Sequence, residues 1–332
     1  MRRMYTRQKN HNKNEKVTFG RSAEEWLSYK SKNLKYSTYI KYRSIYKNHL
    51  ETAVSKMEIS EINIDILDRT VFHVDNAERA LSLNLQDSII NLANQVITFA
   101  NENYGCTVMP LKHRKKAKPK LKTISIFNLN EQARIFQYVY EHMDICGVGI
   151  LLCLSTGLRL GEICALKWED IDFINHILYV RRTVQRIEVD NAETKTILME
   201  SEPKSQCSIR EIPLSQGIIE LLLSNKKEAV YLMNKNKPME PRSYQKKFKS
   251  ILKGAGISDK NFHILRHTFA TNCVNSGMDV KCLSEILGHS DVKITLNRYV
   301  HPTMDTKRKH INTLFDFYCQ ICTCNINNIN NK

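Results

Sequence analysis

The chain has 332 residues, and 42% of them are apolar, which is typical of one large or two smaller folded domains and excludes wholesale disorder. Lysine and arginine total 50 against 34 acidic residues, and the net charge of +16 favours nucleic acid as partner over an anionic membrane. The longest apolar run, Ile145–Leu154, is too short to span a bilayer, and no apolar run follows the basic N-terminus as in a secretory signal. Ten scattered cysteines without disulfide spacing indicate free thiols, so we expect a cytoplasmic protein without membrane contact.

The first hundred residues have helical patterns and no strand alternation. Residues 1–16 form a basic arm, and Ser22–Glu25 reads as a capping box that opens a helix. Further helical patterns cover 38–50, 60–70 and 77–104. We therefore expect an all-helical domain over 17–110. In the helix over 38–50, Tyr39, Tyr42 and Tyr46 share one side, and the residues that project elsewhere are candidate DNA contacts: Lys41, Arg43 and Lys47.

A strongly basic stretch over 111–123 has no periodic apolar pattern, which indicates a linker. No acidic residue occurs between Glu102 and Glu131. Two interpretations are open, a solvated loop between domains or a strap along DNA phosphates, and the charge of the whole chain favours the strap. The basic side chains concerned are Lys112, Arg114, Lys115, Lys116, Lys118, Lys120 and Lys122.

The second domain, expected over 124–303, begins with helical patterns near 129–142 and 147–156. Three strand-like segments follow, over 177–188, 193–200 and 208–214, and then helical patterns resume to about residue 318. We predict a mainly α protein, in which an all-helical first domain precedes a mainly helical domain with a small three-stranded antiparallel sheet. Residues 304–332 are expected to form a C-terminal helix and a frayed tail.

Two segments of the second domain carry basic residues suited to phosphate chemistry. In TGLRLGE, Arg159 and Glu162 lie three residues apart, either as a surface ion pair or as a carboxylate that holds a guanidinium for bidentate contact with a phosphate. Lys204 lies in a turn between two predicted strands. It is either solvated or an ammonium group placed beside a leaving oxygen.

Three further segments carry histidine, arginine and tyrosine. In HILRH, His263, Arg266 and His267 lie near one helical face. Zinc is disfavoured there, because the glutamate of His-Glu-x-x-His is absent and Arg266 adds a positive charge. In LGHSD, His289 follows a glycine at a helix end, where it either interacts with the helix dipole or serves the site. Tyr299 is either a packing residue or a nucleophile.

Together these residues form a phosphoryl-transfer set. Two arginines and a histidine can neutralise a pentacoordinate phosphate, and a lysine can protonate a departing alkoxide. A tyrosine can attack, although its ordinary pKa is about 10. We expect Arg159 and Arg266 to favour the phenolate of Tyr299 and so to lower that pKa.

On these five ordered motifs, with Tyr299 ten residues after His289, the chain resembles the tyrosine recombinase (phage integrase) family across about 125–302. The resemblance implies that Tyr299 forms a 3′-phosphotyrosyl link and releases a 5′-hydroxyl, while Arg159 and Arg266 clamp the phosphate. It further implies a phosphate hydrogen bond from His289, with Lys204 as general acid and His263 as general base. His267 is expected to be structural, packed behind the site. No cofactor or metal is implied.

The resemblance also implies partners. These are double-stranded DNA at specific recombination sites, a homotetramer in the synaptic complex, and an accessory directionality factor. The amphipathic helix after the tyrosine either packs on its own domain or docks into a neighbouring protomer. Its apolar residues are Ile311, Leu314, Phe315 and Tyr318. A cluster of Cys319, Cys322 and Cys324 with His310 either binds zinc or consists of free thiols.

Several uses of this chemistry remain open. A recombinase that integrates or excises a mobile element competes with one that resolves chromosome or plasmid dimers. Since only about sixteen residues precede the first capped helix, an arm-binding domain is in doubt and a two-domain enzyme is expected. The tail and the basic charge favour the mobile element. A type IB topoisomerase and a non-catalytic DNA-binding regulator are the remaining alternatives.

Overall fold

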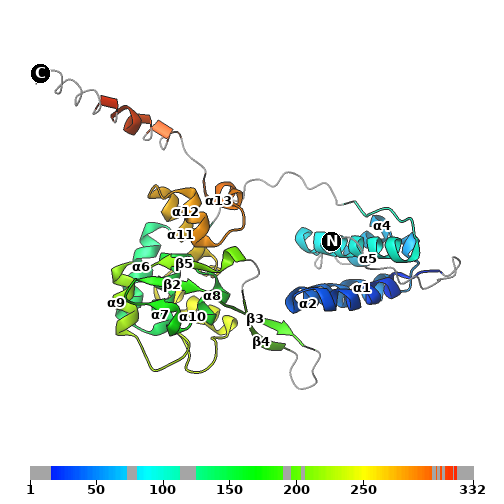
Figure 1. Ribbon diagram of the computed structural model, residues 1–332, viewed down its shortest axis with the longest axis horizontal. Coiled ribbons are helices and arrows are strands. Elements are labelled where there is room, and N and C mark those ends of the chain that lie inside the picture. The colour runs from blue at the N-terminus through cyan, green and yellow to red at the C-terminus, as the bar shows by residue number, and fades with distance from the viewer. Residues whose placement is uncertain are drawn as a thin grey trace, which may run out of the picture. The chain divides into compact units, whose positions relative to one another are not determined.

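The computed structural model describes residues 16–72, 81–112, 125–189, 196–202 and 206–300, and parts of 304–319. The chain divides into two compact units, Met1–Lys122 and Thr123–Lys332. Both are built mainly from helices, and the only sheets of the described residues are small and antiparallel (Figure 1). The predicted fold class is thereby confirmed. None of the described helices has the length and apolar character of a membrane span.

The first unit is helical throughout its described part. Its elements are α1 (Phe19–Asn33), α2 (Tyr36–Ile45), the π-helical η1 (Tyr46–Leu50), α3 (Glu51–Val54), the 3-10 turn η2 (Ile59–Glu61), α4 (Ile64–Leu67), the π-helical η3 (Asp68–Phe72) and α5 (Leu83–Tyr104). The predicted capping box at Ser22–Glu25 is wrong. The helix begins one turn earlier, because extended Thr18 caps it by accepting a hydrogen bond from the Arg21 amide at 3.3 Å, and Ser22 is buried within the helix.

Helix α5 is the centre of this unit. Its apolar face, which includes Ile89 and Val96, is fully buried in one core with Phe19 and Trp26 of α1. Burial of each such side chain contributes about 1.5–3 kcal/mol. The Trp26 ring also packs on Tyr42, at 5.3 Å between ring centroids. The predicted tyrosine side of 38–50 therefore faces this core.

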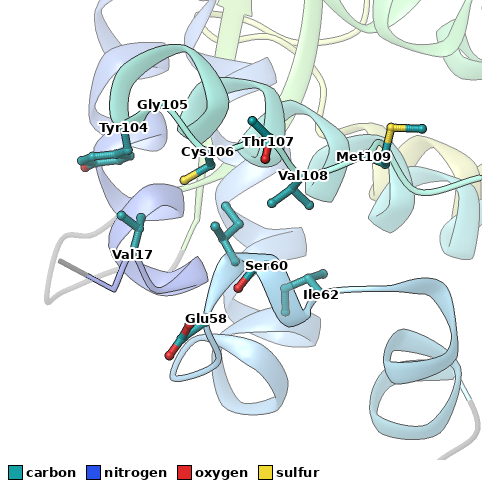
Figure 2. A pocket seen from close by; sticks show the side chains of 11 residues that line it. Val17, Glu58, Ser60, Ile62, Tyr104, Gly105, Cys106, Thr107, Val108 and Met109 are labelled. Carbon is teal, nitrogen blue, oxygen red and sulfur yellow. The ribbon is translucent and has the colours of Figure 1, made fainter. Parts of the chain in front are cut away.

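The chain after α5 folds back along the same helix. Asn94 accepts from the Leu111 amide at 2.6 Å and donates to the Leu111 carbonyl at 3.0 Å, while Asn101 makes the same pair of contacts with Val108. A pocket of about 530 Å³ opens between this returning segment and residues 58–62 (Figure 2). Its lining holds the carboxylate of Glu58 and no basic side chain, so it lacks the features of a phosphate site.

The second unit surrounds helix α7 (Ile145–Thr156), which is buried on nearly all sides. The other helices are α6 (Leu129–Glu141), α8 (Leu160–Ala165), η5 (Trp168–Asp170), η6 (Gln206–Ser208), α9 (Gln216–Ser224), α10 (Pro241–Gly254), α11 (Ile264–Asn275), α12 (Val280–Leu287) and α13 (Val292–Tyr299). Helices α11, α12 and α13 pack against one another, and α11 also packs against α7 (Figure 1). Helices α11, α12 and α13 therefore bring their motifs together.

The strands form two sheets rather than one. A three-stranded antiparallel sheet has the order β1 (Ile171–Asp172), β2 (Ile177–Val180) and β5 (Arg210–Pro213), while β3 (Thr183–Glu188) pairs only with β4 (Thr196–Ser201). The predicted strand over 177–188 is therefore divided after Val180, and its two halves belong to different sheets. The short strand β1 was not predicted, because two residues leave no alternation to detect.

Candidate active site

Arg159 and Glu162 form the first part of the site, where α7 turns into α8. Gly157 ends α7 in the left-handed region with φ +67°, and a Cβ there would lie 2.6 Å from the Phe269 ring, so the turn requires glycine. Arg159 is the N-cap of α8. Glu162 accepts from its amide at 2.9 Å and from its guanidinium at 2.7 Å. The ion pair is therefore part of a helix cap, which fixes the direction of the Arg159 side chain.

Arg210 completes this cluster, and sequence reasoning missed it. From β5 its guanidinium donates to both oxygens of Glu162, at 2.9 and 3.2 Å, and the side chains of the pair are only 5% and 4% exposed. Burial raises the pKa of Glu162, but Arg210, followed by Arg159, outweighs it and leaves that pKa at about 2. A signal existed: the alternation of β5 places Arg210 on the buried side with Ile212, where an apolar residue is expected.

All three arginines donate hydrogen bonds to main-chain carbonyls at the end of α12. The carbonyl of Ile286 accepts from Arg210 at 2.5 Å and that of Leu287 from Arg266 at 2.7 Å, while the carbonyl of Gly288 accepts from Arg159 at 3.3 Å. Carbonyls at a helix C-terminus have no partner within the helix and carry its negative dipole end. They therefore hold the three guanidinium groups close together despite their mutual repulsion.

Arg266 is the most buried of the three, with 2% of its surface exposed. Beyond Leu287 it donates to the Gly157 carbonyl at 2.9 Å, and its other contact is with His289 Nε2, also at 2.9 Å. Because a guanidinium only donates, Nε2 of His289 accepts, and its Nδ1 carries the proton and donates to Thr295 Oγ1 at 2.8 Å. Burial, followed by Arg266 and Arg159, lowers the pKa of His289 to about 4, which keeps this ring neutral at pH 7.

Tyr299 is the last residue of α13, and its side chain is 7% exposed. It packs in an apolar cluster with Phe269 and Leu287, and its hydroxyl lies 2.8 Å from His267 Nδ1. The expectation of a lowered pKa is wrong. Arg266, Arg298 and Arg159 act in that direction, but burial of the phenol is the larger effect and raises the pKa of Tyr299 above 10.

The two histidines of HILRH lie differently from the expectation. His267, expected behind the site, is the residue that contacts the Tyr299 hydroxyl. The His263 ring lies perpendicular to the His267 ring, at 84° and 4.5 Å between centroids. Within the described part of the chain the His263 side chain forms no hydrogen bond with Tyr299. Helical spacing places both residues on one face, and only the packing of α13 decides which one meets the tyrosine.

The remaining predicted residues are partly outside the described structure. Lys204 lies there, as do the basic linker residues Arg114, Lys115, Lys116, Lys118, Lys120 and Lys122. Lys112 is described and exposed, as are Lys41 and Lys47, while Arg43 is half-buried. On the described helical residues near the C-terminus the apolar side chains Ile311, Leu314, Phe315 and Tyr318 are exposed.

Zinc is disfavoured at HILRH and is one of two alternatives for the cysteine cluster of the tail. No group of three or more histidine, cysteine or carboxylate side chains with metal-binding geometry occurs in them. His310, Cys322 and Cys324 of the tail cluster lie outside the described part, so that prediction stays open. Described cysteines that are free thiols are Cys106, Cys146, Cys153, Cys164, Cys207, Cys273 and Cys282.

Models of protein families match both units of the chain. Residues 128–306 match the model of the phage integrase family, and residues 18–68 match that of the N-terminal SAM-like domain of phage integrases. A XerC-like tyrosine recombinase of Caldanaerobacter subterraneus is 29% identical over 91% of this chain and 84% of its own length. The transposase of transposon Tn916 of Enterococcus faecalis is 31% identical, but the match covers 47% of this chain and 42% of the transposase.

Solved structures show the same fold. An integrase of transposon Tn1549 bound to transposon right-end DNA superposes with a TM-score of 0.70 and 20% identity, over 90% of this chain and 99% of the integrase chain. A lambda integrase tetramer bound to a Holliday junction superposes with a TM-score of 0.55 and 16% identity, over 88% of this chain and 80% of the lambda chain.

Proposed function

The chain belongs to the phage integrase family, and from that premise we propose that it is a site-specific recombinase in which Tyr299 breaks and rejoins DNA strands. The observation that carries the proposal is the position of Tyr299 in the same unit as Arg159, Arg266 and His289. These side chains are joined through the end of α12 and the apolar cluster around the tyrosine. This arrangement supports cleavage by a tyrosine acting within its own protomer.

The proposed reaction uses these residues together with Lys204, which lies outside the described residues. Tyr299 Oη attacks the scissile phosphorus, the bond from phosphorus to the 5′-oxygen breaks, and that oxygen takes a proton from Lys204. Arg159 and Arg266 retain donor groups for the non-bridging oxygens while the α12 carbonyls hold them. His289 donates to a phosphate only if Nε2 carries the proton, so its contact with Arg266 has to give way to the DNA. Attack by a 5′-hydroxyl on the phosphotyrosyl bond reverses the sequence.

The biological use is best assigned to a mobile element. The Tn916 transposase and the Tn1549 integrase, which are similar to this chain, both belong to transposons. Resolution of chromosome or plasmid dimers is the second candidate, favoured by the XerC-like relative that matches most of the chain. Double-stranded DNA is the substrate, and a tetramer like that of lambda integrase on a Holliday junction is the expected synaptic assembly. An accessory directionality factor and a cytoplasmic location remain predictions.

The test traps the covalent intermediate. The full chain is incubated with DNA fragments from the region that flanks its own gene, SDS is added, and covalently bound DNA is sequenced to locate the phosphate. Nicked duplexes made across that site should then give an SDS-resistant adduct, and Tyr299→Phe should give none. An adduct formed by Tyr299→Phe would refute the nucleophile. Absence of any adduct favours a non-catalytic regulator, and relaxation without exchange between two sites favours a topoisomerase.

A further inference from the structure

The Tyr299 hydroxyl contacts a histidine to which the family resemblance assigns only a structural role. His267 lies one helical turn after His263 on α11 and faces α13, and its Nδ1 lies 2.8 Å from Tyr299 Oη. The two ring planes are tilted by 53°, with centroids 5.7 Å apart. This contact joins α11 to α13, and the tyrosine atom in it is the one proposed to attack the phosphate.

The protonation states of the two groups allow the tyrosine to be the donor in this hydrogen bond. Positive groups face His267 from its own helix, through Arg266, and from α13, through Arg298. Burial of the ring is the largest cause that lowers the pKa of His267, and these two positive charges lower it further, to about 4. The neighbouring His263, which also lies near Arg159, has a pKa of about 4 for the same first reason and is neutral too. At pH 7 the protonated phenol therefore meets a neutral imidazole, and Oη–H can donate to Nδ1.

We propose that His267, rather than His263, holds the Tyr299 hydroxyl and accepts its proton during strand cleavage; this assignment rests on the proposed function. As Oη bonds to phosphorus, its proton moves to Nδ1 of His267, which becomes an imidazolium. The bond from phosphorus to the 5′-oxygen breaks, and that oxygen is protonated by the general acid. In the rejoining step the phenolate leaves phosphorus and takes the same proton back, so the two half-reactions balance.

The surrounding charges make this transfer dependent on DNA. Without a phosphate, an imidazolium at His267 faces Arg266 and Arg298 and is strongly disfavoured. A bound phosphodiester adds a negative charge beside Arg159 and Arg266, which offsets that repulsion and raises the proton affinity of Nδ1. The tyrosine is therefore activated only when a scissile phosphate is in place.

His263 then has a positioning role. Its ring and the His267 ring form an edge-to-face contact, with their centroids 4.5 Å apart and their planes nearly perpendicular. Such a contact limits rotation of His267 about its side-chain bonds, and so favours the orientation in which Nδ1 faces Tyr299. Loss of this contact should disturb the geometry without removing the proton acceptor.

The experiment measures single-turnover formation of the SDS-resistant adduct on the nicked duplex mapped above. His267→Ala should slow cleavage by about 10²–10⁴-fold, the range for loss of a general base, with DNA binding unchanged. His267→Asn places an amide near the position of Nδ1; it keeps a hydrogen bond but takes no proton, and should remain strongly impaired. His263→Asn, the matched control, should be affected less. Wild-type rates for His267→Ala, or full activity of His267→Asn, would overturn the inference.

A second substrate separates the base from the acid. In a duplex with sulfur in place of the bridging 5′-oxygen, the leaving thiolate needs no proton. The defect of the His267 variants should persist on this substrate, while that of Lys204→Ala should be largely removed. If sulfur instead restores His267→Ala, the histidine acts on the leaving group and the inference is wrong. Failure of the proposed function itself differs from this, because the wild-type chain would then form no adduct through Tyr299 at all.

Discussion

Replacement of Arg210 by methionine should destabilise the second unit by about 3–5 kcal/mol, the usual effect of removing one partner from a buried ion pair. Methionine fills a similar volume, so the main loss is electrostatic. Glu162, whose side chain is 4% exposed, keeps only the Arg159 contacts, while the Ile286 carbonyl loses its donor. Since whole domains are stable by only about 5–15 kcal/mol, a loss of this size is readily measured.

The two tryptophans allow the units to be followed separately. Trp26 lies in the first unit and Trp168 in the second, so urea unfolding of full-length Trp26→Phe reports the second unit through Trp168 fluorescence. Arg186→Met is the matched control. Its partner is also a glutamate, Glu240, but their side chains are 33% and 22% exposed, and the expected loss is small because exposed ion pairs contribute little to stability.

A double variant tests the cause. If the loss comes from a buried carboxylate that has lost its most buried partner, Glu162→Gln should recover part of the stability in the Arg210→Met background. Equal unfolding midpoints for Arg210→Met and Arg186→Met would refute the reasoning, and so would strictly additive losses in the double variant.

Four further outcomes are expected. Lys204→Ala should slow adduct formation far more than it weakens DNA binding, and equal losses of both, by gel shift and adduct assay, would contradict a general acid. Truncation before Met304 should spare DNA binding by the monomer and weaken synapsis, so unchanged recombination would exclude a docking helix. Gly288→Ala should lower the free energy of unfolding in urea by about 1–2 kcal/mol and slow cleavage. The cause is that φ is +64° and an added Cβ would lie 3.0 Å from the Arg210 side chain, so wild-type behaviour would disprove this strain. The site histidines His263, His267 and His289 have pKa values of about 4 in the folded chain against 6.5 ordinarily, so the unfolded chain binds more protons between these two pH values. The free energy of unfolding should therefore fall as the pH drops through that window, and a flat profile of stability against pH would refute the neutral state of these histidines.

Local pattern predicted the fold class and the motif residues, and it did so for physical reasons. The helix around Ile135 carries apolar residues at helical spacing, and the helix around Ile150 is apolar on nearly all sides. The buried side chains of both helices belong to the core of the second unit. The strand over 177–188 was predicted as one element, because alternation continues across Arg181 and Arg182 even though the hydrogen-bonding partners change there. Pairing between strands is a long-range property that a single segment does not encode.

The site was harder to predict where a residue depends on a distant partner. Arg210 takes its significance from Glu162, 48 residues earlier, and from the end of α12, 76 residues later. The contact of His267 with Tyr299 likewise depends on how α13 packs on α11. Motif resemblance identifies residues that take part in the family's chemistry, but it does not identify the buried groups that hold those residues in place.

The three carbonyls at the end of α12 make the site sensitive to helix register rather than to side-chain identity. Main-chain oxygens remain whatever residues occupy positions 286 and 287, so substitutions there leave the acceptors of the three arginines intact. One residue added to or removed from α12 is different. It rotates the helix end by about 100° and shifts it by about 1.5 Å, and all three guanidinium groups lose their acceptors together. The length of α12 is therefore a fixed dimension of the phosphate site. Insertions should be tolerated in the loop before α12 more readily than within the helix.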